Sequence, residues 1–235
     1  MKKIIASFWV GAFVAYIATT LFQPSATETR PQGHLYAPTR ESMIAMQKSQ
    51  FPNDGLVLFG DSITDGLLFV DPKVPVINAG IGGSTTSSYL PFAKKFLKGM
   101  QPKAVIVAIG VNNAHAGFSR EAFSEQYAAL CASGKETGAK VFVSTVLPVV
   151  NDAVEKKGLG SSYFDVDKIH VMNDVIREIA RKNDYALIDS FASLADSEGY
   201  LPAALSTDGV HLSREGYEAW KNVLWKHVEP PLSLP

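Results

Sequence analysis

Cysteine is nearly absent from this sequence of 235 residues, since Cys131 is the only one. A single cysteine excludes an internal disulfide bond and any metal site that needs several cysteine ligands. Its neighbours read Ala-Leu-Cys-Ala in a segment expected to be helical, where a small buried apolar side chain is more usual than a reactive thiol. We therefore expect this residue to contribute to packing and not to the chemistry of a site.

An excess of basic residues is missing as well. The chain has 22 Lys and Arg against 23 Asp and Glu, which gives a net charge of −1, and no basic run follows the N-terminal segment. A nucleic acid is therefore not expected as a partner. The five histidines do not pair at metal-ligand spacing and no His-Glu-x-x-His motif occurs, so the sequence implies no metal or other cofactor.

The chain opens with an uncharged apolar segment behind two lysines. The run from Ile4 to Phe22 is close to the ~20 residues that a helix needs to cross a bilayer. The preceding lysines predict a cytoplasmic N-terminus and export of the remainder. A cleaved signal peptide is the alternative, but its apolar region is normally ~7–15 residues. In addition, Pro24 stands where cleavage after Ala26 would need a small residue, so we favour an uncleaved anchor over residues 1–22.

Residues 23–39 carry no hydrophobic period and are interpreted as an extended, exposed tether. This segment is interrupted by Pro24, Pro31 and Pro38. Residues 40–235 are predicted to form one domain, without internal repeats. It begins with a helix over Arg40–Gln50, whose expected apolar stripe is Met43, Ile44 and Met46.

From Gly55 onward, strands and helices are predicted to alternate. The strands are expected at Leu56–Phe59, Val74–Asn78, Lys103–Ile109, Lys140–Leu147 and Tyr185–Asp189. The helices are expected over Ser87–Lys98, Ser119–Lys135 and Val166–Lys182, and from Ser213 to Pro230-Pro231. Apolar strands without polar alternation indicate burial on both faces, and the alternation with helices predicts a parallel α/β sheet with right-handed crossovers. The long loop over Val149–Tyr163 is typical of a lid or specificity element.

Polar groups follow the ends of the predicted strands, where the working crevice of a parallel sheet lies. The first strand stops at Gly60, and Ser62 follows two residues later. A serine hydroxyl at that point is a candidate nucleophile. Alone, Gly-Asp-Ser is also an ordinary turn and helix cap.

A glycine-rich loop, Asn78–Thr85, follows the second strand. Glycines allow backbone N–H groups to approach an anion closely. A dinucleotide-binding fingerprint is the competing interpretation, but it requires glycine or alanine where Thr85 stands and normally follows the first strand. We therefore set the nucleotide interpretation aside.

Two further segments carry candidate catalytic groups. Asn112, after the third strand, can donate a side-chain N–H to an oxyanion, although an Asx turn would explain the tetrapeptide better when it is taken alone. Asp208 precedes His211 by three residues, so its carboxylate can bind Nδ1–H and leave Nε2 free as a base. Alone, that pair is compatible with a surface helix cap.

Together, and in this order, the four segments resemble the SGNH (GDSL) hydrolase family over about residues 55–227. The blocks of that family are Gly-Asp-Ser, Asn-x-Gly-x-x-Gly-x-Thr, Gly-x-Asn-Asp and Asp-x-x-His. Here they read Gly60-Asp61-Ser62, Asn78-Ala79-Gly80-Ile81-Gly82-Gly83-Ser84-Thr85, Gly110-Val111-Asn112-Asn113 and Asp208-Gly209-Val210-His211. Asn113 stands where the family usually has aspartate. This departure resembles the Gly-Thr-Asn-Asn of platelet-activating-factor acetylhydrolase-like members. The resemblance implies a three-layer α/β/α sandwich with a five-stranded parallel, flavodoxin-like sheet.

The resemblance also implies roles for individual residues. Ser62 is expected to be the nucleophile, His211 its general base and then the acid for the leaving alcohol, and Asp208 the group that orients the imidazole. The oxyanion hole is expected to combine the backbone N–H groups of Ser62 and Gly83 with the side-chain amide of Asn112.

These observations predict a serine hydrolase that cleaves carboxylic esters outside the cytoplasm through an acyl-enzyme. Its partner would be a small ester, such as an O-acetylated glycan or a lysophospholipid, and the N-terminal segment would attach it to a membrane. One alternative is a cell-envelope glycan O-acyltransferase that uses the same triad. Another is a non-catalytic binding module, which would not need Ser62, Asp208 and His211 together. The sequence does not indicate the oligomeric state.

Overall fold

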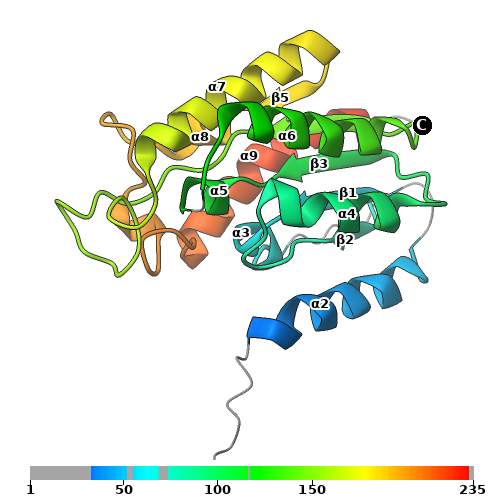
Figure 1. The fold of residues 1–235 in the computed structure, drawn as a ribbon, viewed down its shortest axis with the longest axis horizontal. Helices are drawn as coiled ribbons and strands as arrows, with labels where there is room; N and C mark the ends of the chain where they lie inside the picture. The colour runs from blue at the N-terminus through cyan, green and yellow to red at the C-terminus, as the bar shows by residue number, and fades with distance from the viewer. Residues whose placement is uncertain (1–32, 52–54, 69–73, 116, 233–235) are drawn as a thin grey trace, which may run out of the picture. The chain divides into compact units, whose positions relative to one another are not determined.

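A computed structural model of the protein describes residues 33–51, 55–68, 74–115 and 117–232 (Figure 1). The predicted anchor, residues 1–22, and the tether up to residue 32 lie outside the described residues. Within the described ranges, no helix is long and apolar enough to cross a membrane.

Five parallel strands form one sheet in the order β2-β1-β3-β4-β5. Their bounds are β1 Leu56–Gly60, β2 Val76–Asn78, β3 Ala104–Ala108, β4 Lys140–Ser144 and β5 Ala186–Ile188. All five residues of β1 are buried, as its apolar run predicts for a central strand. The α/β class, the strand count and the parallel pairing are therefore confirmed.

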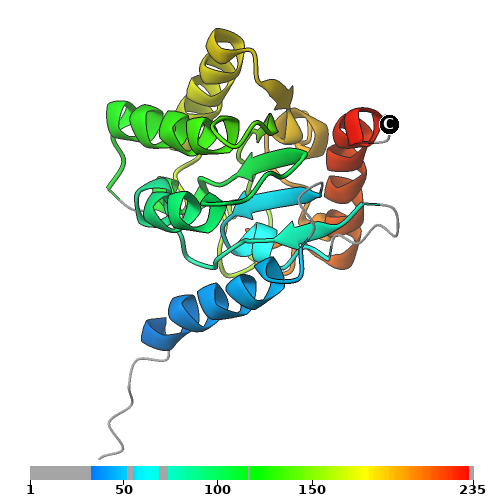
Figure 2. The ribbon, with the colours of Figure 1, turned by 90° about the vertical axis from the view of Figure 1, so that its right-hand side faces the viewer.

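Helices cover the sheet on both faces. The helices of the described residues are α2 Gly33–Lys48, α3 Ser62–Asp65, α4 Thr86–Leu97, α5 Val111–His115, α6 Arg120–Lys135, α7 Val166–Asn183, α8 Ser190–Leu194, η1 Ala203–Leu205 and α9 Arg214–Leu232. Helices α4, α6 and α7 lie side by side on one face and α9 lies on the other (Figures 1 and 2). This arrangement is the predicted three-layer sandwich.

Local sequence signals explain the long helices. Ser119 caps α6 by accepting a hydrogen bond from the Ala122 N–H. The apolar stripe of α7 is buried, at Ile169, Met172, Ile176 and Ile179. Cys131 is buried in α6, and its burial raises the pKa of its thiol, so its packing role is confirmed.

The predicted start of the first helix was wrong. Helix α2 begins at Gly33 and runs through Pro38, whereas the sequence predicted an extended chain up to residue 39. Pro38 lies in the second turn, where it costs one backbone hydrogen bond, and the residues after it form helices well. The predicted stripe is also only partly correct, because Ile44 is buried while Met43 and Met46 are exposed.

Other boundaries shifted by a few residues. Strand β4 stops at Ser144, short of the predicted Leu147, because Val146 bonds a side chain instead of a neighbouring strand. The Val146 N–H donates to Asn173 Oδ1 at 2.7 Å, and Asn173 Nδ2 donates to the Val146 carbonyl at 3.1 Å. Helix α9 ends at Leu232, one residue beyond the proline pair. The short helices α3, α5 and α8 have too few residues for a hydrophobic period to reveal them.

Candidate active site

Ser62 is placed by a strand that ends and a helix that begins at once. It is the first residue of α3, directly beyond β1, so its backbone N–H has no acceptor within that helix. Asp61 caps the helix, with its carboxylate accepting from the Ile63 N–H at 3.1 Å. The serine therefore stands at the carboxyl end of an interior strand of the sheet, as the sequence predicted.

The structure brings Ser62, His211 and Asp208 into one chain of contacts. Ser62 Oγ lies 2.9 Å from His211 Nε2, although the two residues are 149 positions apart. The other ring nitrogen, Nδ1, lies 2.6 Å from Asp208 Oδ2. The Asp208 and His211 side chains are each more than one-third exposed, so a substrate can reach the pair from solvent.

Hydrogen bonds keep the carboxyl group of Asp208 ionised. Partial burial opposes the charge, but the His211 ring and the backbone N–H groups of His211 and Val210 all bind the carboxylate. Together they lower the pKa of Asp208 below its ordinary value. An ionised carboxylate on Nδ1 fixes the imidazole tautomer in which Nε2 can accept a proton from the serine.

The expected oxyanion donors come from two loops that are joined to each other. Asn112 Nδ2 donates to the Ser84 carbonyl at 3.0 Å, which ties α5 to the residue after Gly83. An amide nitrogen has a second hydrogen, which this bond does not use. Gly83 is exposed and has a φ of 75°, a conformation that favours glycine. The structure thus gathers the loops of Gly83 and Asn112 beside each other.

Asn113, which stands where the family pattern has aspartate, makes different contacts from Asn112. Its Oδ1 accepts from the Thr86 N–H at 3.1 Å and its Nδ2 donates to Thr86 Oγ1 at 3.1 Å. Thr86 in turn donates to Gln126 Oε1 at 2.7 Å. Asn113 therefore ties α5 to the start of α4, while its neighbour Asn112 faces the glycine-rich loop.

Sequence reasoning missed the groups that hold α3. Asn78 Nδ2 donates to the carbonyls of Thr64 at 2.6 Å and Leu67 at 2.8 Å, and its Oδ1 accepts from the Gly80 N–H at 2.9 Å. Tyr217 in α9 donates its hydroxyl to the Ile63 carbonyl at 3.1 Å. A polar side chain closing an apolar strand was the available signal for Asn78. Tyr217 carried no local signal.

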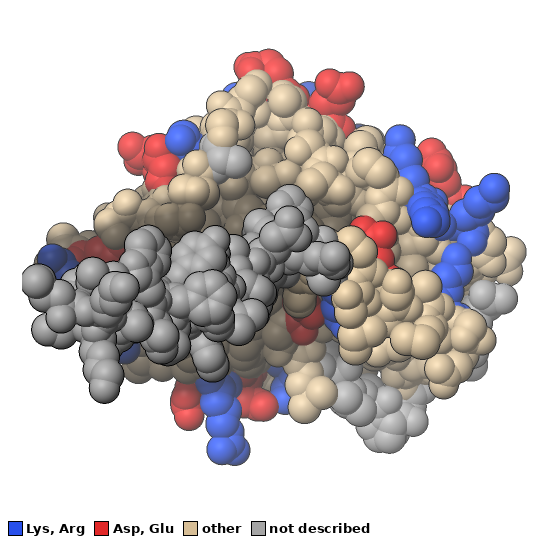
Figure 3. Space-filling model, turned by 60° about the horizontal axis from the view of Figure 1, so that its bottom comes forward, with Lys and Arg blue, Asp and Glu red and all other residues tan. Residues whose placement is uncertain are grey.

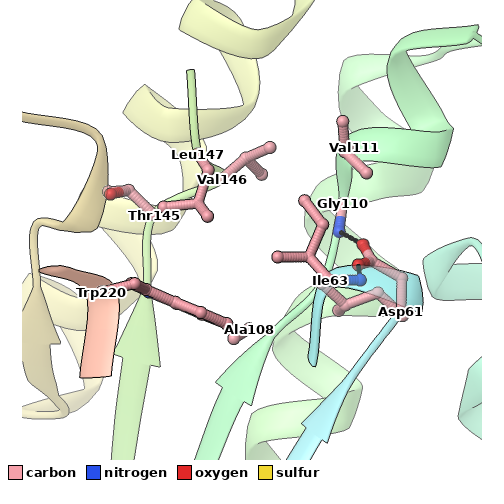
Figure 4. Close-up of a pocket in the computed structure, with 10 residues that line it drawn as sticks. Asp61, Ile63, Ala108, Gly110, Val111, Thr145, Val146, Leu147 and Trp220 are labelled. Atoms are coloured by element: carbon pink, nitrogen blue, oxygen red, sulfur yellow. Dashed lines mark hydrogen bonds between the residues drawn. The ribbon is translucent and has the colours of Figure 1, made fainter. Parts of the chain in front are cut away.

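Asp61 is a second group whose importance the sequence did not reveal. Its side chain is buried, and its two oxygens accept from the N–H groups of Ile63 and Gly110, which joins the ends of β1 and β3 (Figure 4). Burial raises its pKa to about 6, although these hydrogen bonds oppose the rise. A cavity of about 20 Å³ adjoins it, lined otherwise mainly by apolar groups that include Val111, Leu147 and Trp220. That volume suits one water molecule.

The long loop predicted after β4 is hydrogen-bonded to the segment that carries Asp208. The Leu159 N–H donates to the Asp208 carbonyl at 2.6 Å, and the Val150 N–H donates to the Gly209 carbonyl at 2.9 Å. Tyr163 in this loop stacks on His115 at the end of α5, with ring centroids 3.9 Å apart. Both rings are exposed. The loop over residues 149–163 thus contacts both the Asp208 segment and the end of α5. It forms one rim of the site, and we call it the rim loop.

No group of three or more metal-ligating side chains converges within the described part of the chain. On the face shown in Figure 3, basic and acidic side chains are interspersed. The contacts among Ser62, His211 and Asp208 support acid–base and nucleophilic chemistry.

Known proteins share this fold. Three solved structures illustrate the likeness: a presumptive platelet activating factor from Streptococcus pneumonia, a lipase/acylhydrolase from Enterococcus faecalis and an acetyl xylan esterase. Their identities are 20%, 26% and 21%, and their TM-scores are 0.74, 0.61 and 0.60. The matches cover 83%, 76% and 74% of this chain and 93%, 96% and 99% of the others.

A comparison with curated proteins gave no match. The family model described as GDSL-like Lipase/Acylhydrolase matches residues 58–219, which include all four blocks. The chain therefore belongs to the GDSL-like lipase/acylhydrolase family and is a carboxylic ester hydrolase.

Proposed function

We propose that Ser62 is the nucleophile of a two-step ester hydrolysis in which His211 moves the proton. The 2.9 Å contact between Ser62 Oγ and His211 Nε2 carries this proposal. As Oγ forms a bond to the ester carbonyl carbon, its proton passes to Nε2, and Asp208 stabilises the resulting imidazolium. The imidazolium then protonates the leaving alcohol, which leaves an acyl-serine. Water then attacks the acyl-serine through the same proton transfers by His211, which releases the carboxylic acid and restores Ser62.

The negative charge on the carbonyl oxygen needs donors that are already in place. We assign this role to the N–H groups of Ser62 and Gly83 and to the Asn112 amide. Two observations support this assignment: α3 begins at Ser62, and Asn112 is hydrogen-bonded to the loop that carries Gly83. The donors act on charge that develops only during reaction, so they affect kcat more than substrate binding.

Hydrolysis of p-nitrophenyl esters from acetate to palmitate tests the proposal. The sample is the chain from Thr27 onward, beside Ser62→Ala. We expect Ser62-dependent release of p-nitrophenol, together with a serine-linked acyl group by mass spectrometry. Equal rates for the two proteins at every chain length would contradict the assignment of Ser62.

For the substrate, we propose a short acyl group on a polar alcohol such as a sugar. The rim loop supports this choice, because it exposes the polar side chains of Glu155, Lys156 and Ser162 beside Val154 and Tyr163, and polar groups suit a sugar better than a long acyl chain. A structural neighbour is described as an acetyl xylan esterase. An optimum at acetate would agree with the proposal, and an optimum at palmitate would contradict it. If adding a glycan acceptor speeds turnover and yields an acylated glycan, the protein is instead the transferase.

We also propose that the catalytic domain is exported and held at a membrane by residues 1–22. The lysines before the uncharged run from Ile4 to Phe22 support this orientation. Membrane fractionation of the native protein and sequencing of its N-terminus test the proposal. A mature chain that starts near Thr27 would contradict the anchor and indicate secretion.

A further inference from the structure

Arg40 connects helix α2 to the edge of the active site. Its side chain is only 13% exposed, and its Nε lies 2.9 Å from Asp65 Oδ1. The same guanidinium donates to two backbone carbonyls, from Nε to Gly80 at 3.0 Å and from Nη2 to Asn78 at 2.9 Å. A planar group with several donors can hold these acceptors in one fixed arrangement.

The partners of Arg40 belong to the two segments that carry the assigned oxyanion N–H groups. Asp65 is the last residue of α3, the helix that Ser62 begins. Asn78 and Gly80 open the loop that leads to Gly83. This loop packs tightly on α3, since a Cβ atom at position 80 would collide with the backbone nitrogen of Asp65.

We propose that Arg40 is a positioning residue that holds the Asn78–Gly83 loop against α3. The N–H groups of Ser62 and Gly83 can then act on the same oxygen atom. This inference rests on the oxyanion role proposed above and adds a residue from outside the family match, which begins at residue 58. The contacts of Arg40 are with Asp65 and with the carbonyls of Asn78 and Gly80, so it acts through the two backbone segments it joins.

Lys48 provides a matched control on the same helix. Its ammonium donates to the carbonyls of Phe96 and Lys98, at the C-terminal end of α4. Lys48 therefore also ties α2 to the domain through two carbonyls, but it binds neither the glycine-rich loop nor α3. A general loosening of α2 should appear in both Lys48→Met and Arg40→Met, whereas a positioning effect should appear only in the latter.

The first measurement is ester hydrolysis by the wild type, Arg40→Met, Arg40→Lys and Lys48→Met. We expect Arg40→Met to lower kcat by about tenfold or more, because small displacements of catalytic groups are costly. The KM should stay within about threefold, since the donors act mainly in the transition state. Arg40→Lys should be intermediate, because its ammonium keeps the charge without the planar fork. A kcat in Arg40→Met that matches Lys48→Met would overturn the proposal.

The second measurement is hydrogen exchange of the amides in residues 79–85, which requires no activity. Exchange should accelerate in Arg40→Met and stay at the wild-type rate in Lys48→Met. Unchanged exchange in both Arg40 variants would overturn the proposal even if the wild type is active. Absence of Ser62-dependent hydrolysis in the wild type would instead refute the proposed function, and the exchange result would still decide whether Arg40 holds the loop. If Arg40→Met does not fold, Arg40→Lys decides by both measurements.

Discussion

Asp208 holds His211 through both the main chain and the ring. Its Oδ1 accepts from the His211 backbone N–H at 2.8 Å, and its Oδ2 lies 2.6 Å from Nδ1. The spacing of three residues makes both contacts possible, because the intervening turn brings the backbone and the ring of His211 next to the Asp208 carboxylate. The carboxylate thus sets the position of the residue as well as the tautomer of its imidazole.

Replacing Asp208 by asparagine should separate these two effects. The amide oxygen of Asp208→Asn can still accept from the backbone N–H groups, but its NH₂ would face Nδ1 and favour the wrong tautomer. We expect kcat to fall by about 10³–10⁴-fold while the fold is kept. Asp165→Asn is the control, since Asp165 also accepts a backbone N–H, as the cap of α7. Hydrolysis rates beside thermal unfolding test this, and Asp208→Asn activity within tenfold of wild type would contradict it.

The two adjacent asparagines should give opposite results when each is changed to alanine. Asn112→Ala removes a donor assigned to the oxyanion, so kcat should fall by about 10²–10³-fold. Asn113→Ala removes the two bonds to Thr86 and should cost about 1–3 kcal/mol of stability with little change in kcat. Steady-state kinetics and urea unfolding of both variants check this pair. A larger kcat loss in Asn113→Ala would mean that Asn113, and not Asn112, acts in the site.

Local patterns were sufficient to predict the sheet. They also marked Ser62, Asp208 and His211 as candidates, but the roles of these residues came from the resemblance to a known family. Apolar runs ending at Gly60 and at Gly110 marked strands, and polar residues after them marked the crevice. The supports of the site were not predictable in this way. Asp61 bonds a residue 49 positions away and Arg40 bonds residues 38 and 40 positions away. Such contacts depend on the assembled sheet and leave no periodic trace in the sequence.

Gly80→Ala should disturb the site through packing alone. The added Cβ would collide with backbone atoms of Asp65 and Thr64, which flexible side-chain movement cannot relieve. We expect a stability loss of about 1–3 kcal/mol, typical of overpacking, together with a reduced kcat as α3 moves. Gly99→Ala is the control, because Gly99 has a φ of 76° and open space around its Cβ position. That variant should lose stability through strain and keep its kcat. Equal kcat losses in both would contradict the packing argument.

The buried carboxyl group of Asp61 should make stability fall as the pH rises. Burial raises its pKa from 3.8 to about 6, so between these values the folded protein binds more protons at Asp61 than the unfolded chain does. The contribution of this group to the free energy of unfolding therefore decreases from pH 4 to pH 7, by about 3 kcal/mol at most. Asp61→Asn lacks this titration. The difference in unfolding free energy, wild type minus variant, should decline over this range.

Urea unfolding at pH 4, 5, 6 and 7 measures that difference, and groups that have the same pKa in both proteins cancel in it. Asp165→Asn is the matched control, because the opposing desolvation is outweighed by hydrogen bonds from Lys168, which lower the pKa of Asp165. Asp165 is therefore ionised in both the folded and the unfolded state above about pH 5, and its difference should be nearly flat there. A flat or rising difference for Asp61→Asn would mean that Asp61 is already ionised at low pH in the folded protein. Its hydrogen bonds to the Ile63 and Gly110 N–H groups would then outweigh its burial.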